Sequence, residues 1–241
     1  MASLKDFNRF FLTPLLIALA LMAAFSSCSA RIDGVVRDGG AAELELRTAL
    51  DPVAAALIRR VSSFLGTDDA PVLDGPAIGR SMASAPGVRN VSFINISPSA
   101  LEGVISLSSA GEFLASGNVR FIEFSEGPES SSIIITLNRE SAPELISRLS
   151  PEVEEYLSVL MAPAVLGERT TRQEYLDLIS MVYGRPMADE IAAGRILVRI
   201  EFPRPLTAVK GGIARERHAE FDIPLVDILV LEQPISYEIR W

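Results

Sequence analysis

Cysteine and histidine, the side chains that build most metal centres and many catalytic sites, are nearly absent from this chain. Its 241 residues include one cysteine and one histidine. A single cysteine cannot form an internal disulfide, and one histidine with one cysteine makes a His/Cys metal site implausible. The spaced Asp and Asn pattern of a calcium loop is also missing. We therefore predict no metal and no cofactor.

Basic residues are outnumbered by acidic ones, which limits the partners that the chain can bind through charge. The formal net charge is −9 at pH 7. Nucleic acids require clustered Lys and Arg, and anionic lipid head groups attract positive charge. The composition therefore argues against nucleic acid, and against membrane binding through charge alone.

No catalytic constellation can be assembled from the residues present. The chain lacks the G-x-S-x-G elbow of serine hydrolases, and His218 lies in a charged segment that predicts a solvated strand face. The carboxylate pairs Glu154-Glu155 and Asp189-Glu190 are predicted to lie on solvated helix faces. We therefore predict a protein that is not an enzyme, with a carboxylate- or tyrosine-based site as the alternative.

The first 27 residues have the layout of an export signal. Lys5 and Arg9 form a basic start, and an apolar run follows over residues 10–25, interrupted by Thr13 and Pro14. The run is shorter than the roughly 20 apolar residues of a membrane-spanning helix, and no second candidate span follows it. Small residues then precede a cysteine, so the segment predicts a secretory signal that is cleaved before Cys28.

The signal ends in Phe25-Ser26-Ser27-Cys28, which resembles the lipobox of bacterial lipoproteins. In that motif the cysteine thiol is acylated, for example with palmitate, and becomes the first residue of the mature protein. Because Cys28 is the only cysteine of an exported chain, acylation also explains why a thiol is present. An ordinary cleaved signal or an uncleaved anchor, with Cys28 as a bystander, is the alternative interpretation.

The residue after the cysteine bears on the membrane that holds the anchor. Ser29 stands there rather than Asp. In the sorting rule known for some diderm bacteria, this favours transfer to the outer membrane. We expect a lipid-anchored domain in the periplasm or at the cell surface.

Residues 28–241 predict one α+β domain, with an antiparallel-rich sheet and helices on one face. Residues 32–37 and 41–48 predict a hairpin around Asp38-Gly39-Gly40, because Asp-Gly suits the positive φ angles of a tight turn. Further strands are predicted at residues 88–96, 103–108, 119–124, 133–137, 196–202, 206–209, 213–221 and 235–241, whereas 224–231 suits helix or strand. The simplest arrangement is one sheet in which the first and last strands meet.

The middle of the chain, at about residues 141–194, predicts a helical subdomain inserted into the sheet. Helices are expected at about 52–65, 76–85, 110–115, 141–149, 150–161, 171–183 and 186–193. The middle helices carry a wide apolar arc, formed by Tyr156, Leu157, Leu160, Met161, Tyr175, Leu178, Ile179, Met181, Val182 and Tyr183. Core packing explains such an arc, and a lipid- or peptide-binding groove is the alternative.

The two ends of the predicted mature chain resemble the LppM-type lipoprotein domain. The matching features are the Asp33-Gly34-Val35-Val36-Arg37-Asp38-Gly39-Gly40 hairpin after Cys28, then Arg199-Ile200-Glu201-Phe202-Pro203, Lys210-Gly211-Gly212 and the final Tyr237-Glu238-Ile239-Arg240-Trp241. The resemblance implies an α+β lipoprotein domain of the cell envelope, associated with lipid or glycolipid binding. It carries over no site residues, because the matched positions are turn and strand residues.

Three functional hypotheses follow. The first is a lipid-anchored, non-catalytic binding module that holds a hydrophobic ligand or lipid. The second is a structural or assembly partner of the envelope, which would use the apolar arc to dock another protein. The third is an enzyme of unknown type. Cys28 is the one residue to which the sequence assigns a chemical role, as the site of lipidation.

Overall fold

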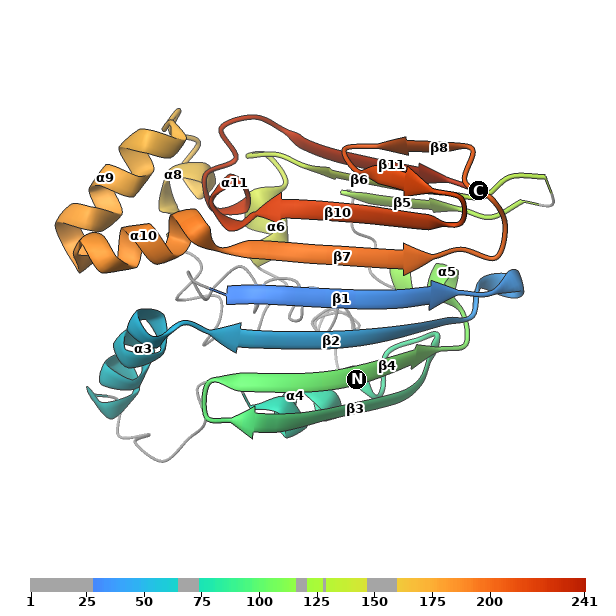
Figure 1. The fold of residues 1–241 in the computed structure, drawn as a ribbon, viewed down its shortest axis with the longest axis horizontal. Helices are drawn as coiled ribbons and strands as arrows, with labels where there is room; N and C mark the ends of the chain where they lie inside the picture. Colours follow the sequence, from blue (N-terminus) through green and yellow to red (C-terminus); the bar gives the residue numbers. More distant parts are fainter. Residues whose placement is uncertain (1–27, 65–73, 116–120, 128, 147–159) are drawn as a thin grey trace, which may run out of the picture.

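The computed structural model of this chain describes residues 28–64, 74–115, 121–127, 129–146 and 160–241 (Figure 1). The predicted export signal at 1–27 and most of the helix predicted at 150–161 lie outside these residues. Within them the chain is α+β, with an antiparallel-rich large sheet and a smaller sheet, which confirms the predicted fold class.

The large sheet has seven strands. In spatial order they are β3 (Val88–Ser97), β4 (Ala100–Leu107), β2 (Ala42–Leu50), β1 (Cys28–Val36), β7 (Arg195–Glu201), β10 (His218–Pro224) and β9 (Ile213–Arg215). β1 and β7 are parallel, and the other neighbouring strands are antiparallel. The predicted hairpin is confirmed: between β1 and β2 a 3-10 turn, η1 (Asp38–Gly40), uses Gly39 and Gly40 at φ 77° and 75°.

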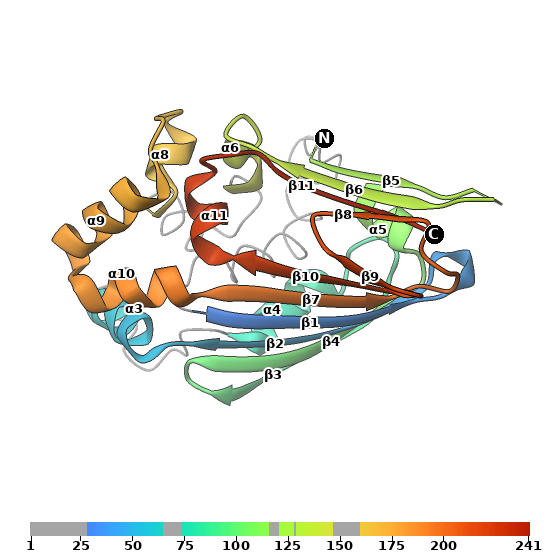
Figure 2. The same ribbon diagram turned by 45° about the horizontal axis from the view of Figure 1, so that its top comes forward.

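The small sheet lies over one face of the large one (Figure 2). Its antiparallel strands are, in spatial order, β5 (Ile122–Ser125), β6 (Ser132–Leu137), β11 (Ile235–Arg240) and β8 (Ala208–Lys210). Two aromatic pairs join the sheets: the ring centroids of Phe202 and Trp241 are 4.6 Å apart, and those of Phe221 and Tyr237 are 5.0 Å apart. Burial of these rings between the layers stabilises the packing of the sheets.

The expectation that the first and last strands meet is wrong. β11 pairs with β6 and β8 in the small sheet, and the late partner of β1 is β7. The chain crosses from the small sheet to the large one at Gly211 and Gly212, between β8 and β9. Gly211 has φ 79°, and a Cβ there would lie 2.6 Å from the Tyr237 ring. Strand alternation alone does not specify which strands pair, so the crossing was not predicted.

The helices of the described residues lie beside the sheets and at one end of them. They are α3 (Pro52–Phe64), α4 (Gly75–Met82), α5 (Ala110–Ala115), α6 (Ala142–Ile146), α8 (Ala162–Val165), α9 (Arg172–Tyr183), α10 (Arg185–Ala193) and α11 (Leu225–Val230). The ambiguous segment at 224–231 is therefore helical. α6, α8, α9 and α10 fall within residues 141–194, and the boundaries of a separate subdomain there stay a prediction.

The single strand predicted at 213–221 is two strands. β9 and β10 pair with Arg215 opposite His218, so Glu216 and Arg217 form a two-residue turn. Glu216 adopts φ 52°, in the left-handed region that residues other than glycine rarely occupy. Glycine and asparagine are the usual residues at such positions. Neither occurs here, so the sequence did not indicate a turn.

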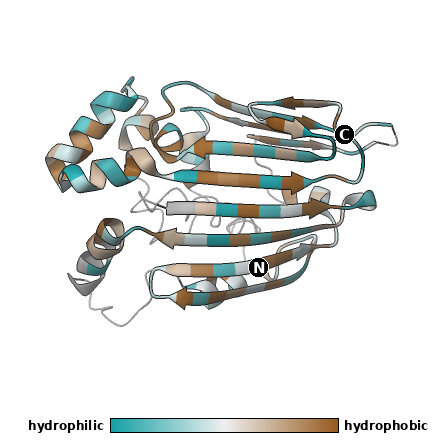
Figure 3. Cartoon of the chain, viewed as in Figure 1, coloured by the Kyte–Doolittle hydropathy of each residue, from teal (hydrophilic) through white to brown (hydrophobic). Residues whose placement is uncertain are grey.

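The side chains of the large sheet separate into a buried and a solvated set. Hydrophobic and hydrophilic residues alternate along its strands (Figure 3). The residues that point inward include Leu46, Phe93, Leu101, Ile105 and Ile196, all of which are buried. Burial of this apolar face beneath the small sheet and the helices is the main force that holds the fold together.

Candidate functional site

Cys28 is the first residue that the structure describes, and it lies in β1. Its backbone pairs with Leu50 on β2, and the next residue, Ser29, pairs with both Ala49 and Arg195. The residue predicted to carry the lipid is thus part of the sheet, and the described domain begins there. Acylation of the thiol stays a prediction.

The end of the large sheet that holds Cys28 is called the anchor end below. A transverse row of paired residues marks it: Ser97, Ala100, Ala49, Ser29 and Arg195. Two helices adjoin this end, because α3 begins just after β2 and α10 ends just before β7. α9 packs beside α10, so three helices gather at the anchor end (Figure 1).

Glu190 connects two of these helices. Its carboxylate oxygens accept hydrogen bonds from the backbone N–H groups of Val53 and Ala54, at 3.0 and 3.1 Å. The first N–H groups of a helix have no partner within the helix, so a carboxylate from α10 completes the start of α3. The prediction that Glu190 lies on a solvated helix face is therefore wrong.

The apolar arc predicted for the middle helices is divided between core and surface. Leu160, Met161, Tyr175 and Ile179 are buried, whereas Tyr156 and Leu157 lie outside the described residues. The remaining four side chains of the arc are exposed, at 44% for Leu178, 78% for Met181, 61% for Val182 and 37% for Tyr183. Core packing explains the first group, and the exposed group is available to contact a ligand or a surface.

Tyr175 illustrates the buried side of α9. It is 1% exposed, and its hydroxyl has no hydrogen-bond partner among the described residues. Burial raises the pKa of this phenol, and the nearby Tyr183 raises it further. The hydroxyl is therefore held neutral, which is the form that an apolar environment favours.

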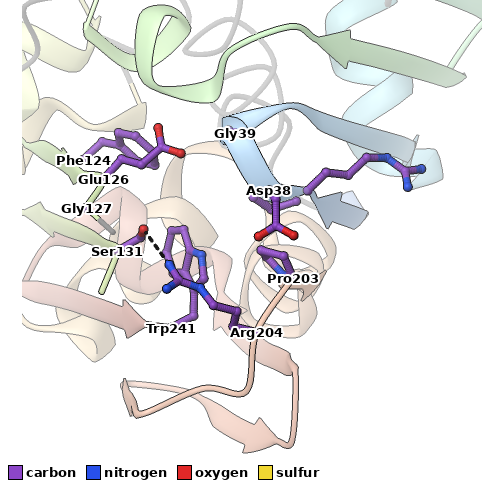
Figure 4. Close-up of a pocket in the computed structure, with 12 residues that line it drawn as sticks. Asp38, Gly39, Phe124, Glu126, Gly127, Ser131, Pro203, Arg204 and Trp241 are labelled. Carbon is purple, nitrogen blue, oxygen red and sulfur yellow. Dashed lines mark hydrogen bonds between the residues drawn. The ribbon is translucent and has the colours of Figure 1, made fainter. Parts of the chain in front are cut away.

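A cleft lies at the opposite end of β1 from Cys28. Its volume is about 360 Å³. It is lined by Val36, Arg37, Asp38, Gly39, Gly40, Phe124, Glu126, Gly127, Ser131, Pro203, Arg204 and Trp241 (Figure 4). The lining mixes cations, carboxylates and aromatic rings, so this cleft is not a hydrocarbon pocket.

Backbone and side-chain hydrogen bonds fix one wall of this cleft. Ser131 and Trp241 exchange backbone hydrogen bonds of 2.9 and 3.0 Å, and Arg204 donates from Nη2 to the Ser131 hydroxyl at 3.2 Å (Figure 4). The carboxylate of Glu126 lies against Gly40 of the β1–β2 turn. The lining comes from segments far apart in the sequence, so no local motif could reveal the cleft.

The outer face of the large sheet is covered by ion pairs. Pairs between neighbouring strands include Arg47–Glu102, Arg199–Glu220 and Arg195–Asp222, and Arg217 of the β9–β10 turn pairs with Glu201. Nε2 of His218 lies 3.6 Å from the Glu201 carboxylate, and the side chain is 31% exposed. The sequence predicts a solvated strand face for His218, and the structure places this residue on β10 with its side chain only partly exposed.

Asp33 is a carboxylate of the outer face whose pKa lies below its ordinary value. The hydrogen bond from Nε of Arg31, at 2.6 Å, lowers its pKa, and partial burial opposes this effect. The charges of Arg199 and Arg47 lower the pKa further. Asp33 is therefore held as an anion by the neighbouring arginines.

Among the described residues, no three His, Cys, Asp or Glu side chains are grouped so that they could hold a metal ion. Within the same residues, no helix has the length and apolar character needed to cross a membrane.

Comparisons with known proteins give one weak likeness. No protein-family model matches the chain, and no curated protein matches it. Among solved structures, the chain is similar to the folded domain of LppM from Mycobacterium tuberculosis, determined by NMR. The TM-score is 0.43 at 11% sequence identity, with 89% of this chain and 88% of that chain covered. The resemblance to LppM-type domains is thus a weak likeness of fold.

Proposed function

We propose that this chain is a lipid-anchored protein of the bacterial cell envelope. Residues 1–27 direct export and are removed, and Cys28 carries the acyl chains. The supporting observation is the segment Phe25-Ser26-Ser27-Cys28, which follows a basic start and an apolar run and contains the only cysteine of the chain.

We further propose that the domain is a non-catalytic binding module for a hydrophobic ligand or lipid. Four large apolar side chains of α9 are exposed, and contiguous apolar surface on a protein commonly marks a contact site. Ser29 favours the outer membrane of a diderm cell, with the domain in the periplasm or at the cell surface.

Fatty-acid labelling in cells tests the anchor. Cells that express the full chain are fed an alkyne analogue of palmitate, and the labelled protein is detected after membrane fractionation. We expect the natural chain to incorporate label and to fractionate with membranes, whereas Cys28→Ala should accumulate as unlabelled precursor. Ser27→Ala is the matched control, because it changes the lipobox but keeps the thiol and should remain labelled. Membrane-bound, labelled Cys28→Ala protein would overturn the proposal.

Photo-crosslinking from α9 tests the ligand class. A photoreactive amino acid at Leu178 should give lipid adducts in cells, whereas the same residue at Glu102, on the outer face of the sheet, should not. One dominant protein adduct from position 178 would instead favour the assembly-partner hypothesis. Residues 29–241, expressed without the signal and the anchor and purified from their producing cells, should also carry lipid in native mass spectrometry. A clean mass of the protein alone would contradict the binding module.

A further inference from the structure

The turn between α9 and α10 forms an exposed apolar tip. The tip consists of Met181, Val182, Tyr183, Arg185 and Pro186, all of which are exposed. Gly184 joins the two helices at φ 91°, a conformation that favours glycine. The last turn of α9 thus exposes its apolar side chains, whereas Tyr175 and Ile179 in the earlier turns are buried.

The tip projects beyond the anchor end of the sheet. In both ribbon views α10 continues the line of β7 outward, away from the strands, and α9 returns beside it (Figures 1 and 2). α10 has nine residues, so at 1.5 Å per residue it extends about 13 Å. Since Ser29 pairs with Arg195, one residue past Gly194, Cys28 lies near the base of this projection.

The composition of the tip suits the boundary between hydrocarbon and water. Met and Val are apolar, tyrosine carries a polar hydroxyl on an apolar ring, and arginine extends its charged group from an apolar stem. Arg185 pairs with Asp189 at 3.8 Å, and both side chains are largely exposed. A pair so exposed is weak, so Arg185 can also meet a lipid head group.

We propose that this tip inserts into the interface of the same membrane that holds the Cys28 acyl chains. The inference rests on the proposed lipid anchor, which brings a bilayer to the anchor end. Cys28 itself is paired in the sheet, opposite Leu50, so no spacer separates the anchored residue from the domain. Tethering makes a small apolar contact intramolecular, so it forms even though it would be too weak alone.

A second apolar group supports the bilayer as the occupant. Ile96 on β3 is 57% exposed and adjoins Ser97, in the row of paired residues that marks the anchor end. β3 and β7 lie on opposite sides of β1 in the sheet, so Ile96 and the tip lie on opposite sides of Cys28. An acyl chain on Cys28 therefore brings the bilayer between two exposed apolar groups.

The insertion fixes the orientation of the domain. β1 has nine residues, so its ends are about 26 Å apart at 3.3 Å per residue. The cleft beside Arg204 and Trp241 lies at the end opposite Cys28 and is turned away from the membrane. The domain then stands on the anchoring leaflet and presents that cleft to the compartment beyond.

Site-specific fluorescence on the lipidated full chain tests the insertion. Because the only native cysteine carries the lipid, a second cysteine is a unique free thiol for a nitrobenzoxadiazole label. Val182→Cys reports the tip, and Ile213→Cys on β9 is a matched control, since these side chains are 61% and 58% exposed. Each protein is reconstituted in vesicles of phosphatidylethanolamine and phosphatidylglycerol that contain doxyl-labelled phosphatidylcholine. Unaltered circular dichroism and thermal melts verify folding of both variants.

We expect strong quenching and a blue shift for the label at position 182, and an aqueous spectrum at position 213. Equal quenching at both positions would overturn the upright orientation. An aqueous label at position 182, on protein that carries its acyl chains and floats with the vesicles, would overturn the insertion but leave the anchor intact. A blue shift at position 182 without quenching by the doxyl lipids would reveal a protein contact and also overturn it. Absence of acyl chains would contradict both proposals.

Discussion

The carboxylate of Glu190 on α10 accepts a hydrogen bond of 3.0 Å from the backbone N–H of Val53, at the start of α3. Residues 137 positions apart in the sequence are thereby joined. The second oxygen accepts from Ala54 at 3.1 Å. Because α10 leads into β7 and α3 follows β2, this contact holds the helices in place around the strand that begins at Cys28.

Removal of the Glu190 carboxylate should destabilise the domain. In Glu190→Ala, two N–H groups at the start of α3 lose a charged acceptor, and we expect a cost of about 1–2 kcal/mol in the free energy of unfolding. Urea denaturation of residues 29–241, expressed without the signal and the anchor, measures it. The neighbouring Asp189→Ala is the control, because that side chain is 70% exposed, and it should change stability by less than about 0.5 kcal/mol. Equal losses for the two variants would contradict the role of Glu190.

Gly103 on β4 leaves space for an aromatic ring on the adjacent strand. It pairs directly with Phe93 on β3, and a Cβ at position 103 would lie 2.0 Å from the Phe93 ring. Phe93 is 5% exposed, so the ring cannot move into water without loss of core contacts. Gly103→Ala should therefore destabilise the domain by about 1–3 kcal/mol.

A double-mutant cycle tests this reason for the loss. Phe93→Leu removes the ring and should make Gly103→Ala less costly, which gives a favourable coupling energy between the two positions. Thermal unfolding of the four proteins measures the coupling. Additive effects would show that glycine is required at position 103 for its backbone conformation and not to leave space for the Phe93 ring.

Local patterns predicted most elements of the fold but not their assembly. The Asp38-Gly39-Gly40 turn was predicted because an Asp-Gly pair favours a tight turn regardless of its tertiary surroundings. The partner of β11 was not predicted, because Tyr237 and Ile239 alternate equally well in either sheet. The pairing depends on the crossing at Gly211, where a three-dimensional contact with Tyr237, and not a local propensity, requires glycine.

The same limit applies to the candidate site. Cys28 could be predicted as the site of lipidation because an apolar run, small residues and a single thiol occur in one short segment. The exposure of Val182 could not, because helical periodicity shows which residues share a face but not where the neighbouring layer ends. Glu190 was assigned to solvent for a similar reason: its partners in α3 are far away in the sequence.

Tyr175 predicts an alkaline limit to stability. Burial raises the pKa of its phenol in the folded state, whereas an unfolded tyrosine ionises near pH 10. The unfolded state therefore loses the proton first, and stability falls as pH rises above about 10 toward the folded pKa. Tyr175→Phe removes this group, so its free energy of unfolding should fall less steeply in the same range. Urea denaturation at several pH values between about 8 and 11 gives the slope of the free energy of unfolding against pH, which is then compared between the two proteins.

At neutral pH the same substitution should not harm the domain. The Tyr175 hydroxyl has no partner among the described residues, so its removal loses no hydrogen bond there. We expect Tyr175→Phe to be unchanged, or more stable by up to about 1 kcal/mol. Tyr183→Phe, at a position that is 37% exposed, is the control. A clear loss of stability in Tyr175→Phe alone would show that the hydroxyl is bonded.

Ser29 predicts the membrane in which the anchor resides. In a diderm host that follows the sorting rule, a serine after the lipidated cysteine permits transfer to the outer membrane, whereas an aspartate there retains the protein. Ser29→Asp should therefore shift the labelled protein from the outer to the inner membrane, and Ser29→Ala should leave it in place. Separation of the two membranes on a sucrose gradient measures the distribution. If the natural chain and Ser29→Asp co-fractionate, the contacts of the domain and not this residue determine its membrane.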